Sequence, residues 1–295
     1  MPKTKTLPYL EALFSVIVWG ASFIATKIAV GQVSPVAVVW IRFSIGLPIL
    51  FLAVFMRRQF ALPKKDEWLY FALLGFIGIA FHQWLQSNGL KTAQATTTAW
   101  IITTAPAFIA ALGWLVLKEK LTAVQFFGIA LASLGVLVVV GKGNPASLAA
   151  GKFGTIGDLL ILISALNWAV FSTLSRRGLR ERPSAMLTLW VMTFGWLFTS
   201  VAFFASRGYA EIPALDSRGW QALIYLGVFT TGLAYIAWFD ALAHLPAAQT
   251  GAFLFVEPLS SMAVAAVVLN EAVTFASIAG GAVIIFGIWL VNRKG

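Results

Sequence analysis

The sequence predicts an all-α membrane protein with ten transmembrane helices, arranged as two inverted five-helix repeats with the N- and C-termini inside (N-in, C-in). Three observations predict this fold: an apolar composition, an internal duplication and an uneven placement of basic residues. Of the 295 residues, 60% are hydrophobic and 11% are charged, and the mean hydropathy is +0.87. Soluble domains carry about 25% charged residues. We therefore expect a multi-pass integral membrane protein, surrounded by the lipid bilayer.

The composition also argues against several partners and chemistries. A formal charge of +10 would suggest nucleic acid in a soluble protein, but these basic residues lie between apolar runs, as membrane topology requires. The absence of Cys excludes disulfides and cysteine-ligated metals, and two His leave little for a metal site. We expect no nucleic-acid partner, no metal and no cofactor.

The duplication is clearest in two similar stretches, Ala93–Thr122 and Leu245–Thr274. Residues 93–117 carry no charge, and at about 1.5 Å of helix rise per residue they can cross a bilayer. Pro106 interrupts the first stretch and Pro258 the second, 152 residues later. Further matches at the same spacing are Ala95 with Ala247, Thr98 with Thr250, Ala111 with Ala263, Leu117 with Leu269, Glu119 with Glu271 and Thr122 with Thr274. The chain therefore contains an internal repeat.

Ten apolar runs predict the ten helices. They lie near residues 9–30, 35–56, 68–90, 93–117, 121–140, 156–175, 184–206, 218–240, 247–269 and 274–292. The first run lacks an A-x-A cleavage pattern, so we interpret it as a retained span rather than a signal peptide. Gly141–Gly154 is rich in Gly and Ala and is typical of a linker. The predicted organisation is an N-terminal repeat at 1–142, a linker at 143–154 and a C-terminal inverted repeat at 155–295.

The basic residues predict the orientation of these spans. With both termini cytoplasmic, fourteen basic residues lie inside: Lys3, Lys5, Arg57, Arg58, Lys64, Lys65, Lys118, Lys120, Arg176, Arg177, Arg180, Arg182, Arg293 and Lys294. Six lie outside: Lys27, Lys91, Lys142, Lys152, Arg207 and Arg218. This excess favours N-in and C-in. Because five spans is an odd number, the second repeat must cross in the opposite sense, which permits alternating access to a central site.

Small residues and prolines in the spans each have two interpretations. Gly128 and Gly135, echoed by Gly280 and Gly287, lie two turns apart on one helix face and favour close helix packing over a transport role. Pro106 and Pro258 each remove a backbone hydrogen bond near mid-bilayer, which requires that the freed carbonyls face protein or a wet cavity. These prolines are either packing kinks or gating elements beside a substrate site.

Polar and aromatic side chains within the spans predict a substrate-binding cavity. His82, Gln83 and Gln86 should face inward, because lipid solvates bare polar groups poorly. At the 152-residue spacing Gln83 and Gln86 correspond to Tyr235 and Trp238. The full set is Trp19, Ser22, His82, Gln83, Gln86, Trp100, Asn167, Trp168, Tyr235 and Trp238. Aromatic-lined pockets suit apolar ligands, and the alternative is that the rings only pack the bundle.

Charges in and beside the spans have structural alternatives. Lys27 lies about one turn from a span end and could snorkel to the surface. Arg42 lies about 10 Å into its span by helix rise and needs a partner, with Glu271 or Asp158 as candidates. Glu119 and Glu271 favour anchoring of helix connections. For Asp240 and His244, the structural alternative to a functional role is a solvated turn.

Glu257, next to Pro258, is the candidate for energy coupling. It lies about 15 Å into its span by helix rise, near the bilayer centre. Charged side chains there cost about 3 kcal/mol on insertion scales, which favours titration near neutrality and hence a proton as coupling ion. The alternatives are a neutral Glu257 bonded to backbone that Pro258 frees, and a direct ion pair with a substrate ammonium.

Several motifs together resemble those of a known family. WGASF at 19–23, WIRF at 40–43, the Pro106 stretch ending in KEKLT, and GIALASLGV at 128–136 are similar to the EamA-type exporters of the drug/metabolite transporter superfamily. The resemblance covers nearly the whole chain and implies two inverted five-helix repeats exporting amino acids, metabolites or toxic organic cations. The Trp-rich spans further resemble the YddG-type aromatic amino acid exporters. The second repeat departs from the pattern, because it has NWAVF at 167–171 and no Arg in span 7.

The residues therefore predict a secondary active exporter of amino acids, favouring aromatic or bulky apolar side chains, or of related small organic metabolites. The alternatives are a multidrug or organic cation exporter, or a facilitative carrier or channel of the same fold. We expect no enzyme and no catalytic residues, because H-E-x-x-H and G-x-S-x-G motifs are missing from the sequence.

Overall fold

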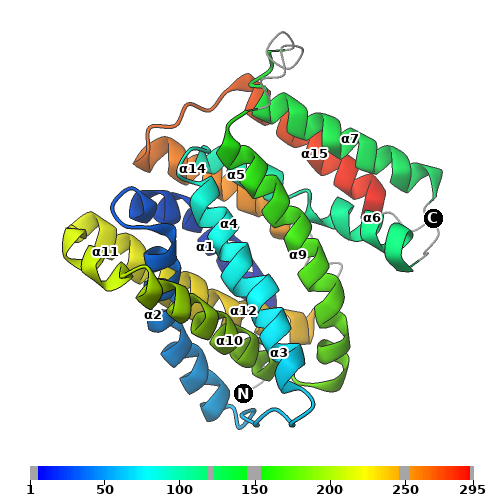
Figure 1. The fold of residues 1–295 in the computed structure, drawn as a ribbon. Helices are drawn as coiled ribbons and strands as arrows, with labels where there is room; N and C mark the ends of the chain where they lie inside the picture. The colour runs from blue at the N-terminus through cyan, green and yellow to red at the C-terminus, as the bar shows by residue number, and fades with distance from the viewer. Residues whose placement is uncertain (1–5, 118–121, 145–153, 246–252, 293–295) are drawn as a thin grey trace.

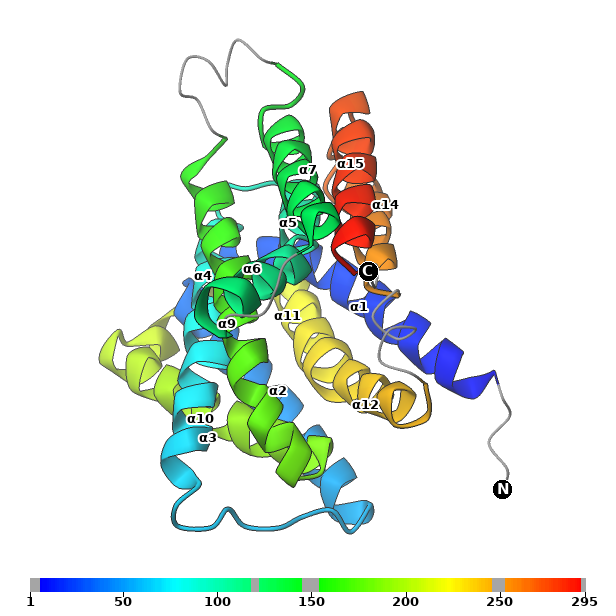
Figure 2. The ribbon, with the colours of Figure 1, turned by 90° about the vertical axis from the view of Figure 1, so that its right-hand side faces the viewer.

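A computed structural model describes residues 6–117, 122–144, 154–245 and 253–292, and these residues form helices and connecting turns without a strand. Figures 1 and 2 show helices far apart in the sequence packing side by side. Seven described stretches are long and apolar enough to cross a membrane: Leu7–Val30, Pro35–Met56, Trp68–Gly89, Ala123–Val140, Ile156–Ser175, Ala185–Ala205 and Ser217–Trp238. Shorter apolar helices occupy Phe253–Val268 and Phe275–Val291. The predicted all-helical, multi-pass class is confirmed.

The helices follow the predicted apolar runs, but several runs are divided. The first half contains α1 (Leu7–Val30), α2 (Pro35–Met56), α3 (Trp68–Gly75), η1 (Phe76–Phe81), α4 (His82–Gly89), α5 (Ala95–Ile102), α6 (Ala105–Leu117) and α7 (Ala123–Val140). The second half contains α9 (Ile156–Glu181), α10 (Ser184–Ala205), η2 (Gly208–Ala214), α11 (Ser217–Ile224), η3 (Tyr225–Leu233), α12 (Ala234–His244), η4 (Phe253–Val256), α14 (Glu257–Val268) and α15 (Phe275–Asn292).

Local sequence explains where several helices begin. Ser34 precedes α2, its side chain accepts a hydrogen bond from the Ala37 N–H, and Pro35 supplies a first residue that needs no such bond. Thr122 and Gln125 form a reciprocal capping box at α7. Asp216 caps α11 by accepting from the Gly219 N–H. These caps satisfy N–H groups that helix geometry leaves without internal partners.

Two π-helices and two helix starts occupy matching positions in the two halves. The segments η1 and η3 are π-helices and end 152 residues apart, at Phe81 and Leu233. The helices α6 and α14 begin 152 residues apart, at Ala105 and Glu257. Pro106 and Pro258 therefore stand in the first turn of a new helix, where proline costs little. The break predicted at each proline is present, and it lies before the proline rather than as a kink at it.

Glycines allow the closest helix contacts. A Cβ added at Gly128 would lie 2.7 Å from the Gly287 carbonyl oxygen, and one at Gly135 would lie 2.8 Å from that of Gly280. This pairing makes α7 and α15 antiparallel neighbours, as Figures 1 and 2 show. The packing role predicted for these four glycines is confirmed, because only a residue without a side chain permits so close an approach.

Helix pairings recur between the halves. Helix α1 packs against α12 and α14, and α9 packs against α4 and α6. Similarly, α2 packs against η3, and α10 packs against η1. These contacts match one another if α1 corresponds to α9, α2 to α10 and η3 to η1. The contacts of α1 with α12 and α14 then correspond to those of α9 with α4 and α6, and the contact of α2 with η3 corresponds to that of α10 with η1.

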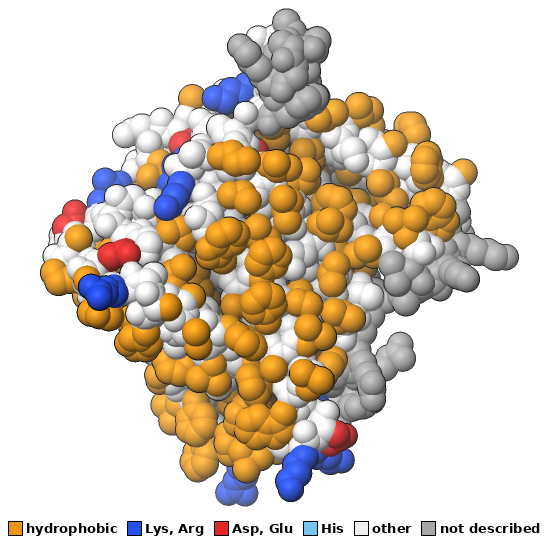
Figure 3. Space-filling view, in the orientation of Figure 1, with side chains coloured by type: hydrophobic (Ala, Val, Ile, Leu, Met, Phe, Trp, Pro, Cys, Tyr) orange, Lys and Arg blue, Asp and Glu red, His pale blue; other side chains and the backbone are white. Residues whose placement is uncertain are grey.

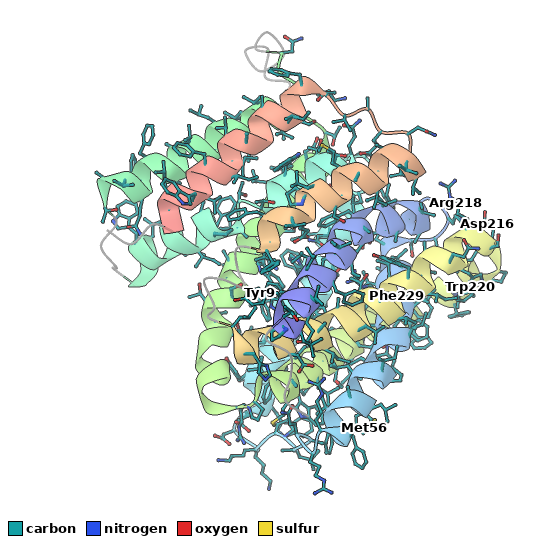
Figure 4. The ribbon with its side chains drawn as sticks, turned by 180° about the vertical axis from the view of Figure 1, so that it is seen from behind. Tyr9, Met56, Asp216, Arg218, Trp220 and Phe229 are labelled. Carbon is teal, nitrogen blue, oxygen red and sulfur yellow. The ribbon has the colours of Figure 1, made fainter. Side chains whose placement is uncertain are left out.

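Charged pairs gather at two opposite ends of the bundle. At the Arg57 end, Arg57 binds both oxygens of Asp240 at 2.6 and 2.8 Å, and Arg182 binds Glu67 at 2.7 Å. Asp240 is thus paired, and its interpretation as a solvated turn residue is wrong. At the opposite Lys27 end, Gln32 donates to Asp216. Figure 3 shows apolar side chains covering the surface between charged regions, and Figure 4 shows Asp216 and Arg218 far from Met56.

Glu271 anchors three segments at the Lys27 end. Its carboxylate accepts from the Ala95 and Thr96 N–H groups at 3.0 and 3.2 Å, which caps α5. Lys27 reaches Glu271 at 3.2 Å and the Ala93 carbonyl at 2.6 Å, so Lys27 pairs inside the protein as well as lying near a span end. The anchoring role expected for Glu271 is confirmed, and its counterpart Glu119 lies outside the described residues.

Stability should therefore depend on the charge of Glu271. Burial acts to raise the pKa of Glu271, but the Ala95 and Thr96 N–H groups and Lys27 outweigh it and hold the pKa below its ordinary value. A depressed folded-state pKa stabilises the fold above the unfolded value of about 4.3, and this contribution is lost as pH falls through the folded-state pKa. Glu271→Gln should cost about 0.5–2 kcal/mol at neutral pH and almost nothing at the acidic limit.

Thermal unfolding in detergent between pH 7 and pH 3 measures this convergence. Asp66→Asn, at an exposed loop position, is the matched control and should follow the parent throughout. Parallel curves for Glu271→Gln and the parent would contradict the assigned cap.

Candidate substrate-binding site

Arg42 lies at the centre of a buried polar cluster. Its side chain projects from α2 and is 6% exposed. Its Nε donates to Thr231 Oγ1 in η3 at 2.9 Å, and its Nη1 donates to Gln83 Oε1 in α4 at 3.1 Å. The Phe43 ring centroid lies 5.5 Å from the guanidinium carbon. Its partners are thus neutral, and neither Glu271 nor Asp158, the carboxylates considered from the sequence, binds it.

One aromatic group lies beside this cluster on α1 and α12. The ring centroid of Trp19 lies 5.3 Å from that of Tyr235 and 5.1 Å from that of Trp238. Tyr235 interacts electrostatically with both Arg42 and Glu257. Three of the residues predicted to line a cavity therefore meet, and they do so within reach of the Arg42 cluster.

A second aromatic group joins α4 to α9. The His82 and Trp168 ring centroids are 5.0 Å apart, and Trp168 lies 5.0 Å from Phe171. His82 also interacts electrostatically with Arg42, and its Nδ1 is buried without a hydrogen-bond partner among the described residues. Asn167 donates to the Ile77 carbonyl inside η1 at 2.7 Å. These contacts bring His82 and Trp168 together, with Gln83 next to His82 in α4, whereas the Asn167 amide predicted for the solute donates to the η1 backbone.

Three further predicted residues take other positions. Trp100 is 2% exposed and packs against Gly281 of α15 in a core cluster that includes Phe23, and its Nε1 is buried without a hydrogen-bond partner among the described residues. Ser22 donates to the Trp19 carbonyl in its own helix at 2.7 Å. Gln86 is half-buried, one turn beyond Gln83, without a hydrogen-bond partner in the described part of the chain. The structure therefore gathers most of the predicted set but places Trp100 in helix packing.

Glu257 stands where η4 gives way to α14. Its backbone carbonyl lies against Gly20 of α1, and the next residue is Pro258. Within the described residues its carboxylate has no hydrogen bond or ion pair, so the predicted bond to Pro-freed backbone is not seen there. Glu257 interacts electrostatically with Tyr235, as Arg42 does.

The cluster also contains residues that sequence reasoning missed. Thr231 binds Arg42, Tyr225 donates to the Val18 carbonyl at 2.9 Å, and the Thr230 hydroxyl is buried without a partner among the described residues. All three lie in η3, where the wider π turn changes which side chains face the bundle interior. An α-helical period therefore could not have found them.

The central site, defined as Arg42, Gln83, His82, Trp19, Tyr235, Trp238, Trp168 and Glu257, combines aromatic rings with one guanidinium and one carboxyl group. Rings offer apolar contact area and bind cations on their faces. The guanidinium offers several directed donors for an anion. The arrangement can therefore hold an amphipathic solute with an aromatic or apolar portion and a charged head group.

Comparison with known proteins identifies a family whose model matches this chain. The model of the EamA-like transporter family matches residues 6–141 and again residues 155–293. Both stretches contribute to the central site.

Similar proteins span almost the same length. An uncharacterized transporter of Archaeoglobus fulgidus is 27% identical over 97% of each chain, and a probable amino-acid metabolite efflux pump of Salmonella typhimurium is 29% identical over 95% of this chain and 92% of its own. YvbV, an uncharacterized transporter of Bacillus subtilis, is 27% identical over 100% of this chain and 93% of its own. One crystal structure has the same fold, with a TM-score of 0.64 and 18% identity over 98% of both chains, which shows the fold alone.

Proposed function

We propose, because this chain belongs to the EamA-like transporter family, that it exports amino acids with aromatic or bulky apolar side chains across the bacterial inner membrane. Its relatives are named transporters and not enzymes. The observation that carries the proposal is the central site, where paired rings of α1 with α12 and of α4 with α9 include Tyr235 and His82, both of which interact electrostatically with the buried Arg42 guanidinium. The relative named a probable amino-acid metabolite efflux pump supports this substrate class.

The mechanism that we propose is alternating access by two inverted repeats. The antiparallel pairing of α7 with α15, the recurring helix contacts and the matching of each half to the family model support the inversion. Residues 1–142 and 155–295 would then be the two repeats, joined by a linker at 143–154. The π-helices and the breaks before α6 and α14 are segments that could move, because they lack uniform helical hydrogen bonding.

The orientation can be tested by reporter fusions. The fourteen-to-six excess of basic residues predicts that a reporter after Arg58 or Arg182 is cytoplasmic and that one within 143–154 is periplasmic. A fluorescent protein and alkaline phosphatase at the same positions provide opposite signals. A cytoplasmic linker would contradict the inverted repeats, whereas the family assignment would stand.

The aromatic walls predict selectivity. Trp168→Ala or Trp19→Ala should weaken transport of phenylalanine about tenfold and transport of threonine much less, because the lost ring surface contacts only the larger side chain. Trp114→Ala is the matched control, since Trp114 is exposed on α6.

Counterflow of labelled amino acids in proteoliposomes measures both the transport mode and this selectivity. Saturable counterflow indicates a carrier, whereas conductance without counterflow would indicate a channel of the same fold. Equal loss for phenylalanine and threonine would show that these rings only pack the bundle. Transport of organic cations without amino acids would favour the multidrug alternative.

Glu257 is the residue that we propose for proton coupling. It is a carboxylate without a protein partner among the described residues, beside a helix start that could move. Glu257→Gln keeps the size and hydrogen bonding of the side chain but removes its titration. In inverted vesicles with an acidic interior, uptake driven by the proton gradient should disappear while substrate exchange survives.

The same assay separates the other roles of Glu257. Loss of both driven uptake and exchange would assign Glu257 to direct pairing with a substrate ammonium. Unchanged driven uptake would remove Glu257 from coupling. Asp66→Asn, in an exposed loop, should leave both activities at the parent level.

A further inference from the structure

We infer that Arg42 binds the carboxylate of the transported solute in the central site, an inference that rests on the proposed amino acid transport. A guanidinium carries five N–H donors. Two of those of Arg42 are used, by Nε on Thr231 and by Nη1 on Gln83. The three others have no acceptor among the described residues, and they include both hydrogens of Nη2.

No carboxylate of the described residues forms an ion pair with Arg42. Their ion pairs join Lys27 to Glu271, Arg57 to Asp240 and Arg182 to Glu67, all at the ends of the bundle. The titratable groups that act on Arg42 are Tyr235, Tyr225 and His82, none of which is a carboxylic acid. A cation inside a membrane protein is costly unless it is paired, so a site that retains one has a use for it.

The geometry suits a planar, two-oxygen anion. Thr231 and Gln83 hold the guanidinium from two different elements, η3 and α4, and fix its plane. Nη1 and Nη2 can then donate in parallel to one carboxylate, a pairing that Lys cannot reproduce. The Tyr235 ring, which interacts electrostatically with Arg42 and packs against Trp19, offers a surface for the apolar portion of the solute.

The internal duplication isolates Arg42 further. Trp19 and Trp168 are 149 residues apart, and so are Gly46 and Gly195. At this spacing the residue of the second half that corresponds to Arg42 is Val191. Glu257 corresponds to Ala105 at the 152-residue spacing. The two charges on either side of Tyr235 are therefore each present in one half only. A solute with distinct ends matches this asymmetry better than a symmetric packing role does.

A purely structural role for Arg42 makes a different prediction. Because Arg42 links α2 to α4 and η3, its loss could loosen the bundle and weaken every ligand alike. Carboxylate binding instead predicts a loss confined to ligands that carry the carboxylate. The ratio of two affinities measured on one variant separates these roles, since general loosening cancels in the ratio.

The test compares phenylalanine with phenylalaninamide, which keeps the ammonium and the ring but lacks the carboxylate charge. Binding to the detergent-solubilised full chain can be followed by tryptophan fluorescence. The parent should bind phenylalanine at least thirty-fold more tightly, an order of magnitude expected for a buried charge pair, and Arg42→Gln should bring the ratio to about one. Lys27→Gln is the control, because Lys27 is paired at the bundle end, and should keep the parent ratio.

Further arms decide the remaining outcomes. If Arg42→Gln does not fold, Arg42→Lys retains the charge without the paired donors and should lower the ratio about tenfold. An unchanged ratio in either folded variant overturns the inference and leaves amino acid export intact. A parent that binds 3-phenylpropanoate but not phenylalanine, with binding lost in Arg42→Gln, overturns the amino acid proposal and supports the role of Arg42. A parent that binds neither carboxylate overturns both.

Discussion

The constraint on which this structure depends is the absence of water from the bilayer interior. Every backbone and polar group there must find a partner within the protein, which is why the apolar stretches form helices. Charged side chains follow the same rule: those of Arg57, Asp240, Lys27 and Glu271 pair at the ends of the bundle. Arg42 and Glu257 are the exceptions among the described residues that the rest of the architecture must accommodate.

Side-chain hydrogen bonds between helices join the irregular segments to α1 and α9. Asn167 of α9 donates into η1, and Tyr225 of η3 donates to the Val18 carbonyl of α1. Ser260 of α14 donates to the carbonyl of Ile17, the residue before Val18 in α1. Helices α1 and α9, which both contribute to the central site, therefore exchange hydrogen bonds with the π-helices or with the helix that begins after a break. Protein contacts there replace the lipid that could not satisfy such groups.

Much of the fold could be predicted from the sequence, because helix in a membrane requires only long apolar runs and the duplication is visible at fixed spacing. The glycine pairs of α7 and α15 and the anchoring by Glu271 followed from the same patterns. The site was less accessible. Trp19 and Trp168 could be singled out by their mid-span position, but Trp100 shares that feature and packs against Gly281 instead. Nothing in an α-helical period indicates a π turn, so Thr231 could not be assigned to Arg42.

The positions where the duplication fails are as informative as those where it holds. A bundle of two similar halves can fold with matching prolines, glycines and π-helices, and all three recur here. Packing alone gives no reason why the position of Arg42 in the first half should hold Val191 in the second. It also gives no reason why the position of Glu257 in the second half should hold Ala105 in the first. Both exceptions interact electrostatically with Tyr235 of α12. In the transport that we propose, the similar halves would supply two equivalent arrangements for movement, while the unmatched Arg42 would recognise the solute and the unmatched Glu257 would carry the proton.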